Sequence, residues 1–195
     1  MATTATPYGL KAVNHVGGTP YAGSTRLLPI ASGYASNLFN GQVVQIGTGG
    51  TIELVTTFGD GVIGVFVGCT YTDPNTQQLT FNNMWPTGLV AADAKAYVID
   101  DPDVVYMAQA DGAITQTDLG QNTGFAADQS TSTGVLINGN STSAVNSTTA
   151  VTATLPFRIV DFVDSPNSTV GDEFTDVLIK FNAGIHSYNN ADGVA

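Results

Sequence analysis

Short apolar runs separated by turns of glycine, aspartate and proline dominate the chain from residue 41 onward. Gln42–Ile46 and residues 51–55 flank a Gly-Thr-Gly-Gly turn, an arrangement typical of a β-hairpin. Residues 62–71 form a nearly continuous apolar run, and we expect this strand to lie at the centre of the core. No capped run with a 3.6-residue period is as long as a typical helix. The pattern therefore predicts an all-β fold.

Further strand patterns complete a single β domain over residues 41–195. The turn Asp-Asp-Pro-Asp at residues 100–103 separates two of these strands, which together resemble a hairpin. We expect a compact β-barrel or β-sandwich of the β-tulip or jelly-roll type. The additional strands are predicted at residues 79–85, 94–99, 104–108, 155–163 and 174–181.

Two segments lack a regular strand pattern. Residues 1–40 are rich in Pro, Gly, Ser and Thr and predict an extended N-terminal arm. Its apolar residues are costly to leave in water, so we expect the arm to lie against its own body or a neighbouring chain. Residues 112–154 predict a loop-rich insertion. A connection of this length without its own structure is unusual in a compact domain, so we expect an ordered excursion that contacts something else.

The charge of the chain limits its partners. Only 11% of the residues are charged, and the formal net charge is -11 at pH 7. This excess of carboxylates repels the phosphates of nucleic acids and anionic lipid headgroups, so we expect no direct nucleic-acid binding and no membrane binding. The first ten residues have neither the basic start nor the apolar run of a secretion signal. We therefore expect a chain that is made in the cytoplasm and not cleaved.

Candidate catalytic and metal-binding residues are few. His15 and His186 lie near opposite ends of the chain, and neither has further ligands at the spacing of a metal site. The aspartates at residues 100–103 offer oxygen ligands for Ca²⁺ but lack the spacing of an EF-hand, and Asp and Pro are common turn residues. Cys69 lies within the central apolar run, as expected for a small buried side chain. We predict no catalytic residue, no metal, no cofactor and no enzymatic activity.

Five short segments of the chain together resemble a known protein family. They are residues 5–10 (Ala-Thr-Pro-Tyr-Gly-Leu), 40–44 (Asn-Gly-Gln-Val-Val), 50–53 (Gly-Thr-Ile-Glu), 62–68 (Val-Ile-Gly-Val-Phe-Val-Gly) and 180–186 (Lys-Phe-Asn-Ala-Gly-Ile-His). These segments resemble the head decoration, or cement, proteins of tailed bacteriophages. The resemblance implies a virion protein on the outside of an icosahedral capsid, often a homotrimer, that clamps adjoining subunits of the major capsid protein.

The candidate partner interface consists of apolar and aromatic residues from the arm and of the single tryptophan. A tail-associated or fibre-associated virion protein and a short major capsid protein are alternatives. So is a β-sandwich glycan-binding module in which Trp85 stacks on sugars. A hydrolase using the aspartates of residues 100–103 is a further alternative, although nothing specifies the partners of these groups. The candidate interface residues are Tyr8, Leu10, Leu27, Leu28, Ile30 and Trp85.

Overall fold

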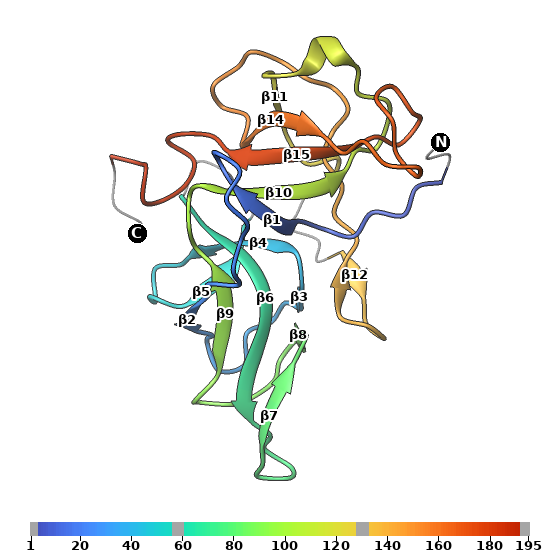
Figure 1. The fold of residues 1–195 in the computed structure, drawn as a ribbon. Helices are drawn as coiled ribbons and strands as arrows, with labels where there is room; N and C mark the ends of the chain where they lie inside the picture. Colours follow the sequence, from blue (N-terminus) through green and yellow to red (C-terminus); the bar gives the residue numbers. More distant parts are fainter. Residues whose placement is uncertain (1–3, 56–60, 128–132, 192–195) are drawn as a thin grey trace.

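The computed structural model describes residues 4–55, 61–127 and 133–191 and confirms the all-β prediction (Figure 1). Within these ranges the one helical element is a single 3-10 turn, η2 (Gln116–Asp118), and no helix is long and apolar enough to cross a membrane. The strands are β1 (Lys11–His15), β2 (Arg26–Pro29), β3 (Leu38–Phe39), β4 (Gln42–Ile46), β5 (Ile52–Leu54), β6 (Val62–Thr72), β7 (Leu79–Asn82), β8 (Met84–Trp85), β9 (Lys95–Ile99), β10 (Val104–Gln109), β11 (Asn122–Thr123), β12 (Gly134–Val135), β13 (Asn140–Ser141), β14 (Phe157–Phe162) and β15 (Asp176–Phe181).

One sheet has five strands in the order β1-β10-β15-β14-β11, and every neighbouring pair is antiparallel. Burial alternates along β14, where Phe157 and Ile159 are buried while Arg158 and Val160 are exposed. One face of the sheet therefore covers the core and the other faces solvent. The two strands predicted at residues 155–163 and 174–181 are confirmed as the adjacent pair β14 and β15.

The second sheet has six strands and is centred on β6. Its order is β2-β9-β6-β4-β5, and β7 pairs with the far half of β6. The predicted β4–β5 hairpin forms, and the N–H of Gly47 donates to the carbonyl of Thr51 in its turn. A parallel bridge between Ile30 and Ile52 joins the two ends of the strand order, so the sheet curls toward a barrel.

Two apolar clusters share β6, which confirms this strand as the centre of the core. Val65 belongs to the cluster between the two sheets, together with Tyr106 of β10 and Phe181 of β15. Phe66, the next residue, points to the opposite face and packs in the second cluster with Trp85. Successive residues of a strand project to opposite faces, so a strand buried on both sides reads as a continuous apolar run.

A glycine allows β6 and β9 to approach each other closely. Gly64 lies where the pairing of β4 with β6 shifts register, and its φ is +155°. A Cβ atom at this position would overlap the carbonyl oxygen of Ile99. Only glycine fits this bulge without moving the backbone.

The N-terminal segment differs from the predicted extended arm, because three of its parts are strands of the body. β1 is an edge of the five-stranded sheet beside β10, β2 is an edge of the six-stranded sheet beside β9, and β3 pairs with β8. The segment is held in place because Leu10 and Ile30 are buried in the two apolar clusters. The strands Lys11–His15, Arg26–Pro29 and Leu38–Phe39 thus belong to sheets of the body, and the residues between them connect these strands.

The hairpin predicted over residues 94–108 is wrong. Both strands form, but β9 lies in the six-stranded sheet and β10 in the five-stranded sheet. The turn at residues 100–103 carries the chain from one sheet to the other. Apolar alternation indicates that a segment is a strand but does not specify which strand pairs with it.

The segment predicted as a loop-rich insertion folds back onto both sheets, and Gln42 of β4 in the six-stranded sheet donates a hydrogen bond to the Thr133 carbonyl. It contains η2 and three two-residue strands, β11, β12 and β13. Isolated bridges join Ala110 to Val145 and Asn122 to Ala150. The described part of this segment is therefore ordered by contacts with its own domain.

Candidate protein-binding surface

Four apolar side chains from three strands lie together on one face of the six-stranded sheet. Leu27 of β2 pairs with Tyr97 of β9, while Thr70 of β6 pairs with both Lys95 of β9 and Phe81 of β7. Directly paired residues project from the same face, as do residues two apart in one strand. All of these side chains therefore share one face. We call its apolar residues, Leu27, Leu79, Phe81 and Tyr97, the exposed sheet face.

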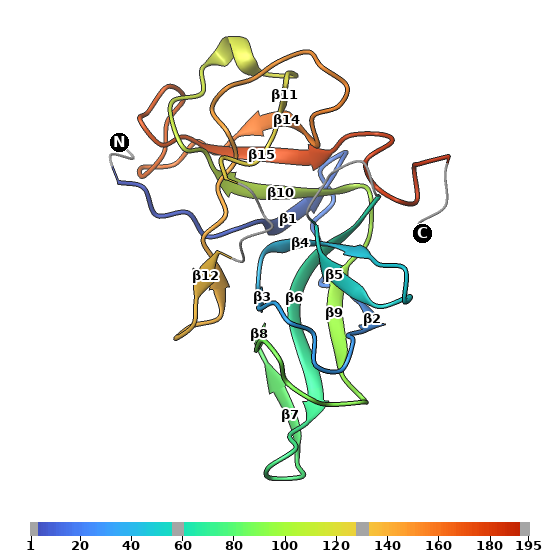
Figure 2. The same ribbon diagram turned by 180° about the vertical axis from the view of Figure 1, so that it is seen from behind.

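This face is accessible because the five-stranded sheet covers only part of the six-stranded one. Val65 and Ile99 lie on the same side but belong to the core between the sheets. Farther along, β6 and β7 extend away from the five-stranded sheet in both views (Figures 1 and 2). Leu27 is 48% exposed, Phe81 65% and Leu79 76%. Contiguous exposed apolar side chains of this kind mark interaction surfaces.

Phe81 is ordered although it is exposed. Its ring centroid lies 5.7 Å from that of Tyr97, with the two rings tilted by 57°. Gly68 of β6 lies beneath Phe81, and a Cβ atom there would come within 3.0 Å of Phe81 Cζ. The Phe81 ring therefore rests directly on the backbone of β6. Rigid aromatic side chains lose little conformational entropy when a partner covers them.

A cation and a strand edge border the exposed sheet face. Lys95 is exposed on this face and makes no ion pair with a described residue. β7 pairs with β6 alone in the described part of the chain, which leaves its second edge without a strand. An unpaired edge can accept a strand from another chain. Apolar area, a fixed aromatic pair and a free edge together favour binding to another protein.

Three of the predicted interface residues keep some exposure. Leu27 lies within the exposed sheet face. Tyr8 and Leu28 are half-buried, and Leu28 packs against the cluster inside the six-stranded sheet. The hydroxyl of Tyr8 donates to Asp176 Oδ1 over 3.0 Å. Burial, with the nearby Asp176 carboxylate, holds the pKa of Tyr8 well above its usual range.

The other three predicted interface residues, Leu10, Ile30 and Trp85, are buried within the chain and are not available to a partner. Trp85 is 0% exposed, its ring meets that of Tyr71 edge-on at 5.8 Å, and its Nε1–H donates to the Tyr34 carbonyl. These residues are apolar because they fill the two clusters. The glycan-binding alternative thereby loses the tryptophan on which it depended.

The sequence pattern missed Leu79, Phe81 and Tyr97 as surface residues. The alternation Leu79-Thr80-Phe81-Asn82 indicates a strand with one apolar face. Whether the five-stranded sheet covers that face depends on where this sheet ends. The residues of β7 and their neighbours in the sequence do not indicate where it ends.

The aspartates of residues 100–103 hold several parts of the chain together. The lysine that contacts Asp103 also lowers the pKa of that carboxyl group, through a hydrogen bond and its charge. With their carboxylates engaged in this way, these residues act as a junction between both sheets and the C-terminal segment. The contacts are Asp100 with Arg26 (2.8 Å) and Tyr188 (2.7 Å), Asp101 with His15 (3.4 Å) and Asp103 with Lys180 (2.7 Å).

In residues 4–55, 61–127 and 133–191, no three His, Cys, Asp or Glu side chains are grouped so that they could hold a metal ion. Comparison of the chain with protein-family models, curated proteins and solved structures found no match. The exposed sheet face is therefore the feature from which we infer a function.

Proposed function

We propose that this chain is a non-enzymatic structural protein of a phage virion. It binds the outside of the capsid as a homotrimer and stabilises the shell by clamping adjoining subunits of the major capsid protein. The observation that carries the proposal is the exposed sheet face with its aromatic pair, Phe81 and Tyr97. The sequence segments that resemble phage decoration proteins supply the identity of the partner.

The energetics of such a surface suit a protein that decorates a large particle. Burial of a fully exposed large apolar side chain stabilises a complex by about 1.5–3 kcal/mol. Phe81 and Leu79 lie on β7, whose second edge is unpaired in the described part of the chain, so a capsid subunit can add backbone hydrogen bonds to the apolar contact. A trimer presents three copies of the surface, and simultaneous contacts strengthen attachment through effective concentration.

The direct test is cryo-electron microscopy of particles that contain this chain. Trimers over the junctions between capsid subunits, with β7 facing the shell, are the expected result. Density confined to the tail would favour a tail or fibre protein. Absence of the chain from every particle would reject a virion role.

A binding assay on capsids assembled without the chain tests the surface itself. The double variant Leu79→Ser, Phe81→Ser should lose most capsid binding while remaining folded. Leu136→Ser, Ile137→Ser is a matched control, because these two neighbouring apolar residues are 66% and 98% exposed in the β12–β13 turn. Equal binding by both double variants would remove the exposed sheet face from the proposal.

A further inference from the structure

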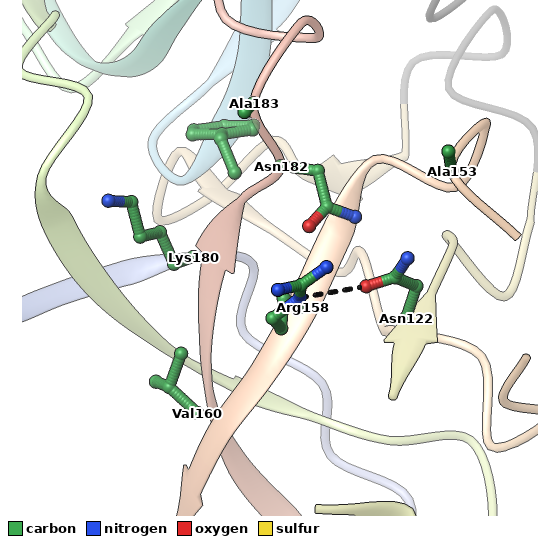
Figure 3. Close-up of a pocket in the computed structure, with 8 residues that line it drawn as sticks. Asn122, Ala153, Arg158, Val160, Lys180, Asn182 and Ala183 are labelled. Carbon is green, nitrogen blue, oxygen red and sulfur yellow. Dashed lines mark hydrogen bonds between the residues drawn. The ribbon is translucent and has the colours of Figure 1, made fainter. Parts of the chain in front are cut away.

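A small pocket opens on the solvent-facing side of the five-stranded sheet, away from the exposed sheet face. Its volume is about 270 Å³, enough for a small functional group but less than most drug-sized ligands occupy. The pairing of β15 with β14 places Lys180 opposite Arg158, and the pairing of β14 with β11 places Arg158 opposite Asn122. Three polar side chains thus stand side by side across three strands (Figure 3).

Two partly buried hydrogen bonds fix the orientation of Arg158. Its Nε–H donates to Asn122 Oδ1 over 3.2 Å. Asn122 is only 4% exposed, and its own Nδ2 donates to the Thr152 carbonyl over 3.0 Å, which prevents the amide from turning away. Within the described residues, this is the one hydrogen bond of the Arg158 guanidinium, and no carboxylate forms an ion pair with it. No described residue accepts a hydrogen bond from its two terminal nitrogens.

The charge around the pocket is opposite to that of the whole chain. Lys and Arg together number five in a chain of net charge -11, and two of the five line this pocket. No Asp or Glu lines it. Lys180 already contacts Asp103 over 2.7 Å, whereas no carboxylate among the described residues pairs with Arg158. An arginine fork with its terminal nitrogens free matches the geometry of a carboxylate, which it binds through two parallel hydrogen bonds.

The other residues that line the pocket can contact the aliphatic stem that carries a carboxylate. Asn182 lines the pocket with its amide, and the Nδ2 of that amide is anchored on the Leu155 carbonyl at 2.7 Å. Val160 and Ala183 add apolar surface beside the polar row. A carboxylate on a short aliphatic stem can therefore pair with Arg158 while its stem contacts these residues.

We propose that this pocket binds a carboxylate, with the guanidinium of Arg158 as its bidentate partner. Asn122 is a positioning residue that holds the guanidinium in place. The carboxylate comes either from an acidic side chain of another protein chain or from a free small carboxylic acid. This proposal is independent of capsid binding by the exposed sheet face.

Titration of ¹⁵N-labelled protein with sodium acetate, at ionic strength held constant with sodium chloride, tests carboxylate binding. The Arg158 Nε–H and Asn182 side-chain signals should shift and saturate. In Arg158→Gln, the affinity measured from the Asn182 signals should fall at least tenfold. Lys95→Gln removes the same charge from the other sheet and should bind as the wild type does. Shifts that never saturate, or equal affinity in Arg158→Gln, would overturn the proposal.

A second titration distinguishes the two sources of the carboxylate. A Gly-Glu-Gly peptide with blocked ends presents a glutamate side chain without terminal charges. At least tenfold tighter binding of this peptide than of acetate would assign the site to a side chain of another protein. Acetate binding that is equal or tighter would assign it to a free acid. Failure of both probes to saturate would reject the site while leaving the capsid-binding proposal intact.

Discussion

The backbone of Gly64 lies so close to β9 that a Cβ atom at this position would overlap the carbonyl oxygen of Ile99. The central strand of the six-stranded sheet therefore depends on a residue that has no side chain. The obstacle is backbone, so a rotamer change cannot relieve it.

Gly64→Ala should accordingly lower the free energy of unfolding by about 3 kcal/mol or more. Gly50→Ala is the matched control, because Gly50 also has a positive φ (+68°) but nothing lies within 4 Å of its Cβ position. The control should lose only about 1–2 kcal/mol, the cost of the left-handed backbone. Urea denaturation followed by circular dichroism measures both values, and equal losses would contradict the close contact with Ile99.

Trp85 and Phe81 are both aromatic, but we expect opposite effects from their replacement. Trp85 is fully buried, so Trp85→Ala should cost about 3–5 kcal/mol of stability. Phe81→Ala removes a largely exposed ring and should change stability by less than about 1 kcal/mol. Trp85 is the only tryptophan, so Trp85→Ala leaves no tryptophan fluorescence with which to follow unfolding. Urea denaturation followed by circular dichroism can be used for both variants. A stable Trp85→Ala protein would place this residue outside the core.

The sequence predicts those elements whose partners are close in the chain. The β4–β5 hairpin is encoded by two short strands and the Gly-Thr-Gly-Gly turn between them. β6 is recognisable because a strand buried on both faces needs a continuous apolar run. In both cases the signal and the structure lie within the same few residues.

The sequence does not predict pairings between distant segments. β1 pairs with β10, about 90 residues later, and the short run from residue 11 to residue 15 has no feature that specifies this partner. The same limit explains the incorrect β9–β10 hairpin and the unexpected exposure of Phe81. In each case the outcome depends on which sheet lies opposite, a property of the whole fold.

Cys69 should be almost unreactive in the folded protein. It is fully buried, its Sγ contacts the Met84 carbonyl at 3.3 Å, and burial raises the pKa of its thiol to about 12. Iodoacetamide at pH 8 should therefore label native protein at least about a hundredfold more slowly than protein in urea, because only the thiolate reacts. Mass spectrometry of the alkylated protein measures both rates. Rapid labelling of the native state would show that β6 opens or that the thiol is accessible.

His186 should make stability depend on pH. The side chain is buried, and its Nδ1 accepts a hydrogen bond from the N–H of Tyr188. Burial lowers the pKa of His186 below its ordinary 6.5, and the nearby Asp100 and Asp101 carboxylates oppose this shift only in part. Between the folded and the unfolded pKa, the unfolded chain binds more protons than the folded one. The stabilisation of the folded protein that comes from neutral His186 is therefore complete above pH 6.5. It is lost as pH falls through 6.5 toward the folded pKa.

Two measurements separate this effect from the titration of carboxylates. The His186 ring signals in an NMR titration should have a midpoint below 6.5. In His186→Gln, which cannot ionise, the decrease in unfolding free energy between pH 8 and pH 5 should be smaller than in the wild type. The difference between the two slopes belongs to His186, because all other groups are shared. A midpoint at or above 6.5, or equal slopes, would show that protonation of His186 does not oppose folding. In that case the charge of His186 would not affect how the C-terminal segment packs beside Val62.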